Sequence, residues 1–529
     1  MKPSASSPSP WVIRLWALVA GLAAAFAQPP FGVLPGLLGY ALLLRLLDTE
    51  GERPLRSAFA RGWFAGLGYF AVSCWWVVEP FMVDAKDQGW MAPIALPLLA
   101  GGLALFWGVA GLLYRVLGRN GLARVLVFAG AFGFLEYLRG HVLTGFPWDL
   151  PGETWRAGSA PSQAASLVGA YGLSWITLAI AAAPAVLFDK TSRLEKALTA
   201  AVIAGFLAVL YAYGAVRLAH TPATSPTAPL VRVVQADIDQ KSKWKPENLP
   251  EVFQTYVNLT RERRGPRPDV VIWPEGALPA VIDDLVAPDS PYGPRLRDAI
   301  APGQTLMMGA NHAQARPNGA IAYYNSLVVF RREADGLRVT GVYDKHRLVP
   351  FGEYMPMGDL AGKIGFRSLV HMPDDFTAGP PPRPLTSPGL PPLQPLICYE
   401  ALFPGFTRGA IQRSDLRPSW ILNVSNDAWF GRTSGPLQHL NMASYRAIEE
   451  GLPIVRATPT GVSAVIDAFG RVQPGARLGL GAFGVIDSRL PPALAPTPYE
   501  RYGDAPLGLM LSLSALVGLA ARLRRSTFG

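Results

Sequence analysis

Apolar segments of nearly membrane-spanning length dominate the first 218 residues of this 529-residue chain. A helix needs about 20 consecutive apolar residues to cross the hydrocarbon core of a bilayer. Because the first segment leads within four residues to the second, we do not expect a cleaved signal peptide. The sequence therefore predicts an eight-helix transmembrane bundle. Its expected spans cover 11–27, 31–47, 62–83, 91–114, 121–138, 164–188, 197–216 and, near the C-terminus, 505–522.

The distribution of Lys and Arg predicts how these spans are oriented. Positive side chains near the ends of spans favour the cytoplasmic side of the membrane. With a cytoplasmic N-terminus, 15 such residues fall on the inner side, against four on the outer side. This pattern predicts a seven-span domain over 1–218, an extracytoplasmic domain over 219–504, and a C-terminal transmembrane helix with a cytoplasmic tail over 505–529.

Composition excludes several other classes of protein. Hydrophobic residues make up 50% of the chain and charged residues 16%, which excludes a disordered polymer. The net charge of +10 lies mostly beside the apolar segments and forms no basic face with interleaved aromatic residues, so we expect no nucleic-acid partner. Two cysteines and six scattered histidines make neither a disulfide framework nor a zinc-binding pattern, and we expect no metal site.

Residues 219–504 have the pattern of a globular domain that begins after a Pro- and Thr-rich linker at 219–229. Short runs rich in β-branched residues alternate with amphipathic helical stretches such as 247–263 and 437–450, which indicates a layered α/β sandwich. We interpret the Pro-rich segment 371–394 as a surface loop. The expected strands cover 230–234, 270–273, 306–309, 326–330, 337–343, 395–398, 420–424, 453–456, 462–467 and 484–487.

Reactive or charged side chains follow three of these strands. Glu275 ends the run VIWPE, Lys345 ends VYDK, and Cys398 ends LIC. Taken singly, a solvated charge or an inert buried cysteine is the commoner explanation. Taken together, they make a nucleophile with a base and a cation.

A thiol with a pKa of ~8.5 needs such activation to attack at neutral pH. Glu275 would act as the base if it lies within hydrogen-bond reach of the sulfur. Lys345 would favour the thiolate and stabilise an oxyanion, with the backbone N–H of Tyr399 as a second oxyanion donor. Serine–histidine catalysis is not expected, since the chain has no Gly-x-Ser-x-Gly elbow.

The ordered motifs WPEG, YDKxRLVPFGEYxP, ICYE and NVSNDAWFG resemble those of the nitrilase superfamily. That resemblance implies an αββα sandwich with a Glu-Lys-Cys triad.

The whole arrangement of spans and domain resembles the membrane-bound apolipoprotein N-acyltransferase family. It implies that Glu353 and Glu400 orient Lys345 or share its charge. It also implies roles for Trp244 in substrate packing, Asn325 in polarising a carbonyl and Tyr399 in shaping the pocket. The chain departs from the family at Pro459, where a polar residue, often Asn, is usual.

The resemblance implies a reaction without metal or organic cofactor. A fatty acyl chain would pass from a membrane phospholipid, chiefly phosphatidylethanolamine, to Cys398 as a thioester. It would then pass to the α-amine of the diacylglyceryl-cysteine that begins an apolipoprotein. The implied location is the bacterial inner membrane, with the catalytic domain in the periplasm. A soluble amidase needs no spans, so the eight-helix bundle favours a lipid substrate.

Two other functions remain as alternatives. The first is a membrane-tethered nitrilase-type amidase or hydrolase, in which water takes the acyl group. The second is a transporter or a non-catalytic lipoprotein-binding module. No repeated pair of Gly- or Pro-broken half-helices supports transport, and the three triad residues argue against a non-catalytic role.

Overall fold

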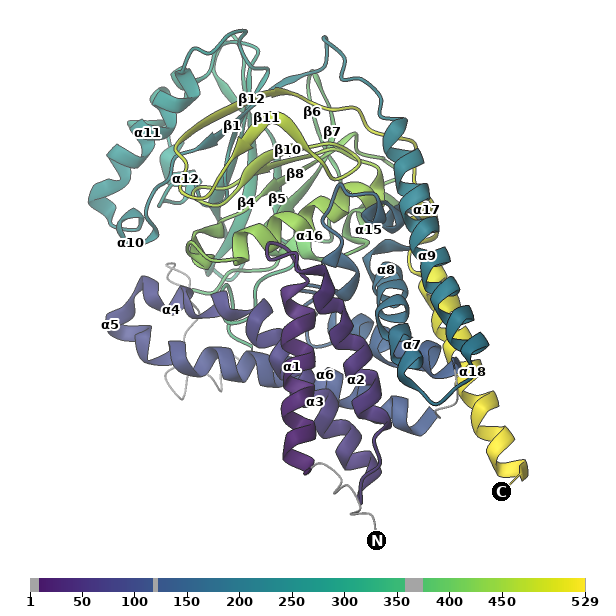
Figure 1. Cartoon of the computed structure of the whole chain (residues 1–529). Helices are drawn as coiled ribbons and strands as arrows, with labels where there is room; N and C mark the ends of the chain where they lie inside the picture. The colour runs from purple at the N-terminus through teal and green to yellow at the C-terminus, as the bar shows by residue number, and fades with distance from the viewer. Residues whose placement is uncertain (1–8, 118–121, 357–373, 529) are drawn as a thin grey trace. The chain divides into compact units, whose positions relative to one another are not determined.

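The computed structural model describes residues 9–117, 122–356 and 374–528, and these form two compact units (Figure 1). One unit is helical and comprises Met1–Phe81, Lys86–His220 and Arg501–Gly529. The other comprises Thr221–Glu500 together with Met82–Ala85. Met357 and Gly358, which directly follow the motif YDKxRLVPFGEYxP, lie outside the described residues.

Each of the eight apolar segments predicted from the sequence contains a helix. Gly89–Leu117, Pro161–Phe188 and Arg193–Ala219 are the stretches that are long and apolar enough to cross a membrane, among the residues described. Pro54–Ser73 and Trp75–Val83, which are bent by 65°, could form a fourth span together. The main helices are α1 (Pro10–Phe26), α2 (Leu38–Asp48), α3 (Pro54–Ser73), α6 (Ala92–Leu117), α7 (Ala123–Arg139), α8 (Ala165–Ala182), α9 (Arg193–Ala219) and α18 (Ala505–Phe528).

Small residues and one buried ion pair organise the helical unit. A Cβ atom at Gly21 of α1 would lie 1.8 Å from the carbonyl oxygen of Ala65, so only glycine allows α1 and α3 to approach this closely. On α7, Arg139 pairs with Glu136, and both side chains are buried. The indole of Trp107 donates to Glu136 Oε1 at 2.6 Å. The charges of the pair are therefore matched inside the bundle, as a buried pair requires.

The second unit contains two six-stranded sheets. Both have parallel strands at the centre and antiparallel strands at the edges. The first sheet has the order β12 (Gly484–Arg489), β1 (Leu230–Gln235), β2 (Val270–Trp273), β3 (Thr305–Ala315), β4 (Ile321–Arg332), β5 (Leu337–Asp344). The second has the order β11 (Val472–Leu478), β10 (Ser463–Ile466), β9 (Ile454–Ala457), β8 (Trp420–Val424), β7 (Leu390–Ile397), β6 (Leu385–Ser387).

Side chains alternate between the two faces of each strand, so that one face packs against the other sheet and the opposite face packs against helices. On β2, Val270 and Ile272 enter a core that includes Leu422 and Val455 of the second sheet. Val271 and Trp273 enter a different core with the helices on the outer face of the first sheet. This confirms the predicted α/β sandwich with two sheets. The helices of the unit are α10 (Gln240–Lys243), α11 (Leu249–Arg261), α12 (Ile282–Leu285), α13 (Tyr292–Ala299), α15 (Phe406–Gln412) and α16 (Gly435–Glu450); α17 (Pro498–Tyr502) crosses the boundary between the units.

The interpretation of 371–394 as a loop was wrong for its C-terminal part. Residues 371–373 lie outside the described residues, but β6 and most of β7 fall in the segment. The prolines of β7 hide its strand pattern, because proline has no N–H to donate. Their carbonyl groups still accept: Ser419 N donates to Pro392 O at 2.7 Å. Pairing with β8 therefore overrides the weak local signal.

Candidate active site

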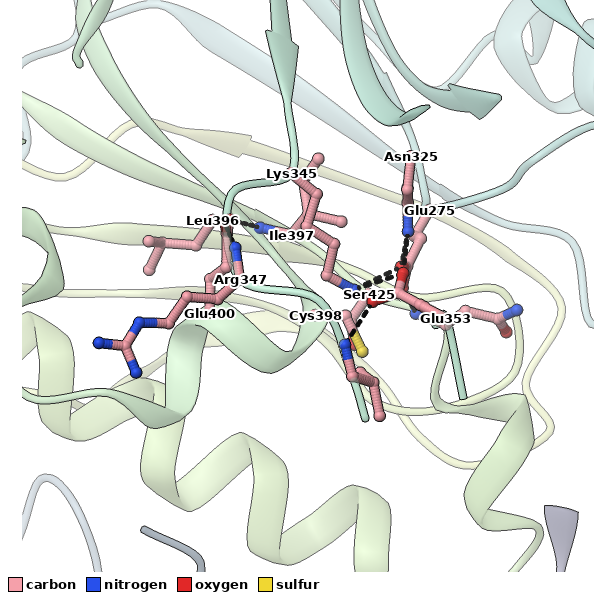
Figure 2. Close-up of polar contacts among 12 residues, drawn as sticks. Glu275, Asn325, Lys345, Arg347, Glu353, Leu396, Ile397, Cys398, Glu400 and Ser425 are labelled. Carbon is pink, nitrogen blue, oxygen red and sulfur yellow. Dashed lines mark hydrogen bonds and ion pairs between the residues drawn. The ribbon is translucent and has the colours of Figure 1, made fainter. Parts of the chain in front are cut away.

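Three loops bring the predicted triad together at the ends of strands (Figure 2). Glu275 follows β2, Lys345 follows β5, and Cys398 follows β7. All three side chains are buried, with Cys398 9% exposed. Cys398 has a φ of 49°, a left-handed conformation that is uncommon outside glycine and that often marks functional sites. The turn at the start of the 3-10 helix Cys398–Leu402 therefore presents the sulfur beside Lys345 and Glu275.

A hydrogen-bonded network joins the charged members of this cluster. Lys345 Nζ lies 2.9 Å from Glu353 Oε1 and 3.4 Å from Glu275 Oε1. The Asn325 amide donates to the same two oxygens, at 2.7 Å and 2.6 Å respectively. Burial alone would lower the pKa of Lys345, but the charges of Glu353 and Glu275 outweigh it and raise that pKa. Lys345 is therefore a fixed cation, held by two carboxylates.

Backbone groups fix the second oxygen of each carboxylate. Glu275 Oε2 accepts from Asn426 N at 2.5 Å, and Glu353 Oε2 accepts from Val349 N at 2.8 Å. Close contact between strands also positions Glu275, since a Cβ atom at Gly309 would lie 2.5 Å from the Cα of Glu275. The Asn325 side chain thus uses its donors to orient the two carboxylates.

The electrostatic surroundings of Cys398 favour a neutral thiol at rest. Burial raises the pKa of Cys398 well above its usual range, and the negative charge of Glu275 raises it further. Lys345 and a hydrogen bond with the Ser425 hydroxyl act in the opposite direction. A thiol in this setting becomes a good nucleophile only when a base takes its proton during attack.

Glu400 accepts hydrogen bonds around the loops that carry Lys345 and Cys398, and not from the ammonium of Lys345 among the residues that the structure describes. Its Oε1 accepts from Tyr343 Oη at 2.9 Å, His346 N at 2.8 Å and Arg347 N at 3.1 Å. Its Oε2 accepts from Ile397 N at 2.8 Å. Burial raises the pKa of Glu400 to about 7, although these hydrogen bonds lower it. Glu400 therefore ties the loop of Lys345 to the end of β7.

The other two predicted residues lie next to members of the site in the sequence or in space. Tyr399 directly follows Cys398, is buried, and makes an edge-to-face contact with Phe403 at 5.0 Å between ring centroids. The ring of Trp244 lies 5.5 Å from Lys243 Nζ, which donates to the carbonyl of Gly276. Trp244 therefore reaches the Glu275 loop through a buried lysine that the sequence analysis did not single out.

A second group of buried polar residues was also missed. Asp427 forms an ion pair with Arg456 at 2.7 Å and contacts His439 Nδ1 at 3.0 Å. The SNDAWFG motif contained the signal, because it places Ser425, Asn426 and Asp427 after an apolar strand, but nothing in it identifies His439. At the unusual Pro459, the carbonyl oxygen accepts from Asp237 N at 2.8 Å, a contact that needs no N–H from residue 459.

Comparisons with known proteins agree with this architecture. Residues 20–183 match the apolipoprotein N-acyltransferase N-terminal domain, and residues 230–495 match the carbon-nitrogen hydrolase family. An apolipoprotein N-acyltransferase of Caulobacter vibrioides is 55% identical over 97% of this chain and 96% of its own length. The chain belongs to the apolipoprotein N-acyltransferase family. It is accordingly an acyltransferase of lipoprotein maturation, with a nitrilase-like catalytic fold.

More distant relatives are also similar. An apolipoprotein N-acyltransferase of Bradyrhizobium diazoefficiens is 37% identical over 97% of this chain and 96% of its own length. Among solved structures, a nitrilase-superfamily amidase from Nesterenkonia aligns with 54% of this chain and 98% of its own, at 20% identity and a TM-score of 0.35.

Proposed function

We propose that residues 219–504 catalyse acyl transfer in two steps through a thioester on Cys398, with Glu275 as the base and Lys345 as the oxyanion-stabilising cation. The observation that carries this proposal is the buried cluster in which one ammonium lies between two carboxylates, beside a thiol. The acyl donor is a membrane phospholipid, with phosphatidylethanolamine as the preferred class. The acceptor is the N-terminal amine of a diacylglyceryl-cysteine.

In the acylation step, the sulfur of Cys398 attacks the ester carbonyl of the phospholipid while Glu275 takes the thiol proton. Lys345 and the Tyr399 N–H stabilise the oxyanion of the tetrahedral intermediate. Collapse breaks the bond to the glycerol oxygen, which leaves with the proton from Glu275. The products are a lysophospholipid and the acyl-thioester.

In the transfer step, the α-amine of the acceptor attacks the thioester and forms a carbon–nitrogen bond. Glu275 takes a proton from the amine and returns it to the sulfur as the carbon–sulfur bond breaks. The enzyme regains its thiol, and the product is an amide. Each step thus uses the same base and the same oxyanion donors.

The charges within the site explain why a negatively charged base can activate a thiol of raised pKa. In the resting state, the charge of Glu275 disfavours a thiolate at Cys398. Proton transfer neutralises Glu275 and removes this repulsion as the sulfur becomes negative. Lys345 then faces the same total charge before and after transfer, so little reorganisation is needed inside a buried site.

We also propose a topology of eight spans in the bacterial inner membrane. Both termini lie in the cytoplasm, and residues 219–504 lie in the periplasm. The asymmetry of Lys and Arg between the expected loops supports this orientation. Reporter fusions test it: a fusion near Pro246 should give a periplasmic signal, and a cytoplasmic signal there would refute the topology.

The acyl-enzyme distinguishes transfer from hydrolysis. Wild-type protein given phosphatidylethanolamine alone should release about one lysophospholipid per enzyme and stop, with the acyl group on Cys398 by mass spectrometry. A diacylglyceryl-cysteine peptide should then discharge it to a hydroxylamine-resistant amide. Steady release of fatty acid without this peptide would support the membrane-tethered hydrolase instead.

Variants of the triad give a second test of the mechanism. Cys398→Ala should abolish both the adduct and the turnover. Glu275→Ala and Lys345→Ala should lower the turnover rate by nearly as much, because the members of a triad act as a unit and the effects of losing them are not additive. Substantial acyl transfer by Cys398→Ala would refute the covalent route.

A further inference from the structure

A buried imidazole contacts the backbone of the proposed nucleophile from a different helix. His439 lies on α16 and is 1% exposed. Its Nε2 atom is 3.2 Å from the carbonyl oxygen of Cys398, and its Nδ1 atom is 3.0 Å from Asp427 Oδ1. The reaction described above assigns no role to this residue.

The partners of His439 hold it in a fixed orientation. Both oxygens of Asp427 accept from Arg456, at 2.9 Å and 2.7 Å, and Oδ1 also accepts from the Ser425 hydroxyl at 2.7 Å. Arg456 and Asp427 are almost completely buried. Burying such charges is costly unless they are paired and hydrogen-bonded in good geometry. The group therefore forms a rigid support that ends at one backbone carbonyl.

The contact of His439 with the Cys398 carbonyl also constrains the N–H of Tyr399, through the peptide bond that joins the two residues. The carbonyl of Cys398 and the N–H of Tyr399 belong to one planar peptide unit and point in opposite directions when that unit is trans. Fixing the direction of the carbonyl therefore fixes the direction of the N–H. The left-handed φ of Cys398 makes such support valuable, because uncommon backbone conformations persist only where the surroundings determine them.

We infer that His439 is a positioning residue for the oxyanion hole: its Nε2–H holds the Cys398 carbonyl and so directs the Tyr399 N–H toward the developing oxyanion. This inference rests on the proposed thioester mechanism. The contact requires only a proton on Nε2, because a carbonyl oxygen can only accept. The contact of Nδ1 with the Asp427 carboxylate likewise requires a proton on Nδ1, so the charged imidazole is the form that makes both hydrogen bonds. A role in the oxyanion hole affects only reactions that generate an oxyanion.

Two reactions of the same sulfur separate this role from a general structural one. Acylation by an ester passes through a tetrahedral oxyanion, whereas alkylation by iodoacetamide displaces iodide and forms none. The full-length protein in detergent would be treated with phosphatidylethanolamine, with p-nitrophenyl butyrate or with iodoacetamide. The rate of Cys398 modification would be followed by mass spectrometry.

We expect His439→Leu to slow acylation by both esters about 100-fold, the usual effect of losing one oxyanion donor. Its alkylation rate should stay within about twofold of wild type. His439→Gln, which keeps an N–H donor, should recover part of the acylation rate. His312→Leu is the matched control, since His312 pairs with Asp283 outside this group, and it should match wild type in both reactions.

Other outcomes would overturn the inference. Equal acylation by wild type and His439→Leu would show that the contact has no kinetic role. A parallel loss of acylation and alkylation would show that His439 supports the thiol or the fold. If the leucine variant does not fold, the glutamine variant must still show the same split between the two reactions. A wild-type protein that p-nitrophenyl butyrate acylates but phospholipid does not would refute the proposed donor, and leave the inference about His439 standing.

Discussion

Replacing Glu400 by glutamine should change how the stability of the protein depends on pH. The Glu400 side chain is completely buried, and its pKa is raised from an ordinary value of 4.5 to about 7. A raised carboxyl pKa means that the folded protein holds this proton more tightly than the unfolded chain does. The resulting stabilisation is complete below pH 4.5, is lost as the pH rises through 7, and is absent above that. At 1.36 kcal/mol per pKa unit, it amounts to about 3 kcal/mol.

Glu400→Gln cannot titrate, so it lacks this pH-dependent contribution. The glutamine amide also faces backbone donors such as Ile397 N–H, so the variant should be less stable than wild type at pH 4.5. That difference should shrink by about 3 kcal/mol by pH 8. For a unit of this size, the change corresponds to roughly 6 °C in the difference between the two melting temperatures.

Thermal unfolding of the full-length proteins in detergent, followed by tryptophan fluorescence, measures this difference. Comparing two proteins at each pH cancels the titration of every group they share. The exposed Glu251→Gln is the control and should differ from wild type by a constant amount. A difference between Glu400→Gln and wild type that stays constant from pH 4.5 to 8, or that grows with pH, would refute the reasoning.

Three further predictions follow from single contacts. Asn325→Asp should lower the rate of Cys398 acylation by about 100-fold, measured as burst lysophospholipid, because it places a third carboxylate beside those of Glu275 and Glu353. Asn325→Ala should lower this rate by less. Cys398→Ser should be almost inactive in the same assay, because a hydroxyl is much harder to deprotonate than a thiol; turnover near wild type would contradict the mechanism. Glu136→Gln should destabilise the helical unit by about 3–5 kcal/mol, since it leaves Arg139 buried without its counter-charge, whereas the exposed Glu52→Gln should leave the melting temperature unchanged.

Local patterns in the chain identified most of the secondary structure and the candidate catalytic residues. Span-length apolar segments, alternating β-branched runs and amphipathic periods depend only on near neighbours in the sequence. They predicted the helices of the first unit and the layered α/β sandwich of the second. Glu275, Lys345 and Cys398 stood out because each follows a strand directly, and strand ends are visible locally.

The same reasoning failed where long-range pairing outweighs local preference. The prolines of β7 carry little strand signal, yet the strand forms because its carbonyl groups and apolar side chains meet β8. Likewise, no local pattern shows that Asn325 joins the carboxylates of Glu275 and Glu353, because these contacts cross 50 and 28 residues of chain.

The sequence by itself determined the kinds of chemistry available to this protein: a thiol, a base, a cation, and enough apolar segments for a membrane. Only the tertiary structure decided what each polar group does. It placed the Glu400 carboxylate within hydrogen-bond distance of both the Lys345 loop and the end of β7, and it brought His439 to the carbonyl of Cys398, 41 positions away. The physical reason is that hydrogen bonds act over about 3 Å and depend on direction. Which donor meets which acceptor is therefore fixed only when packing of the two sheets and their helices sets every atom in place.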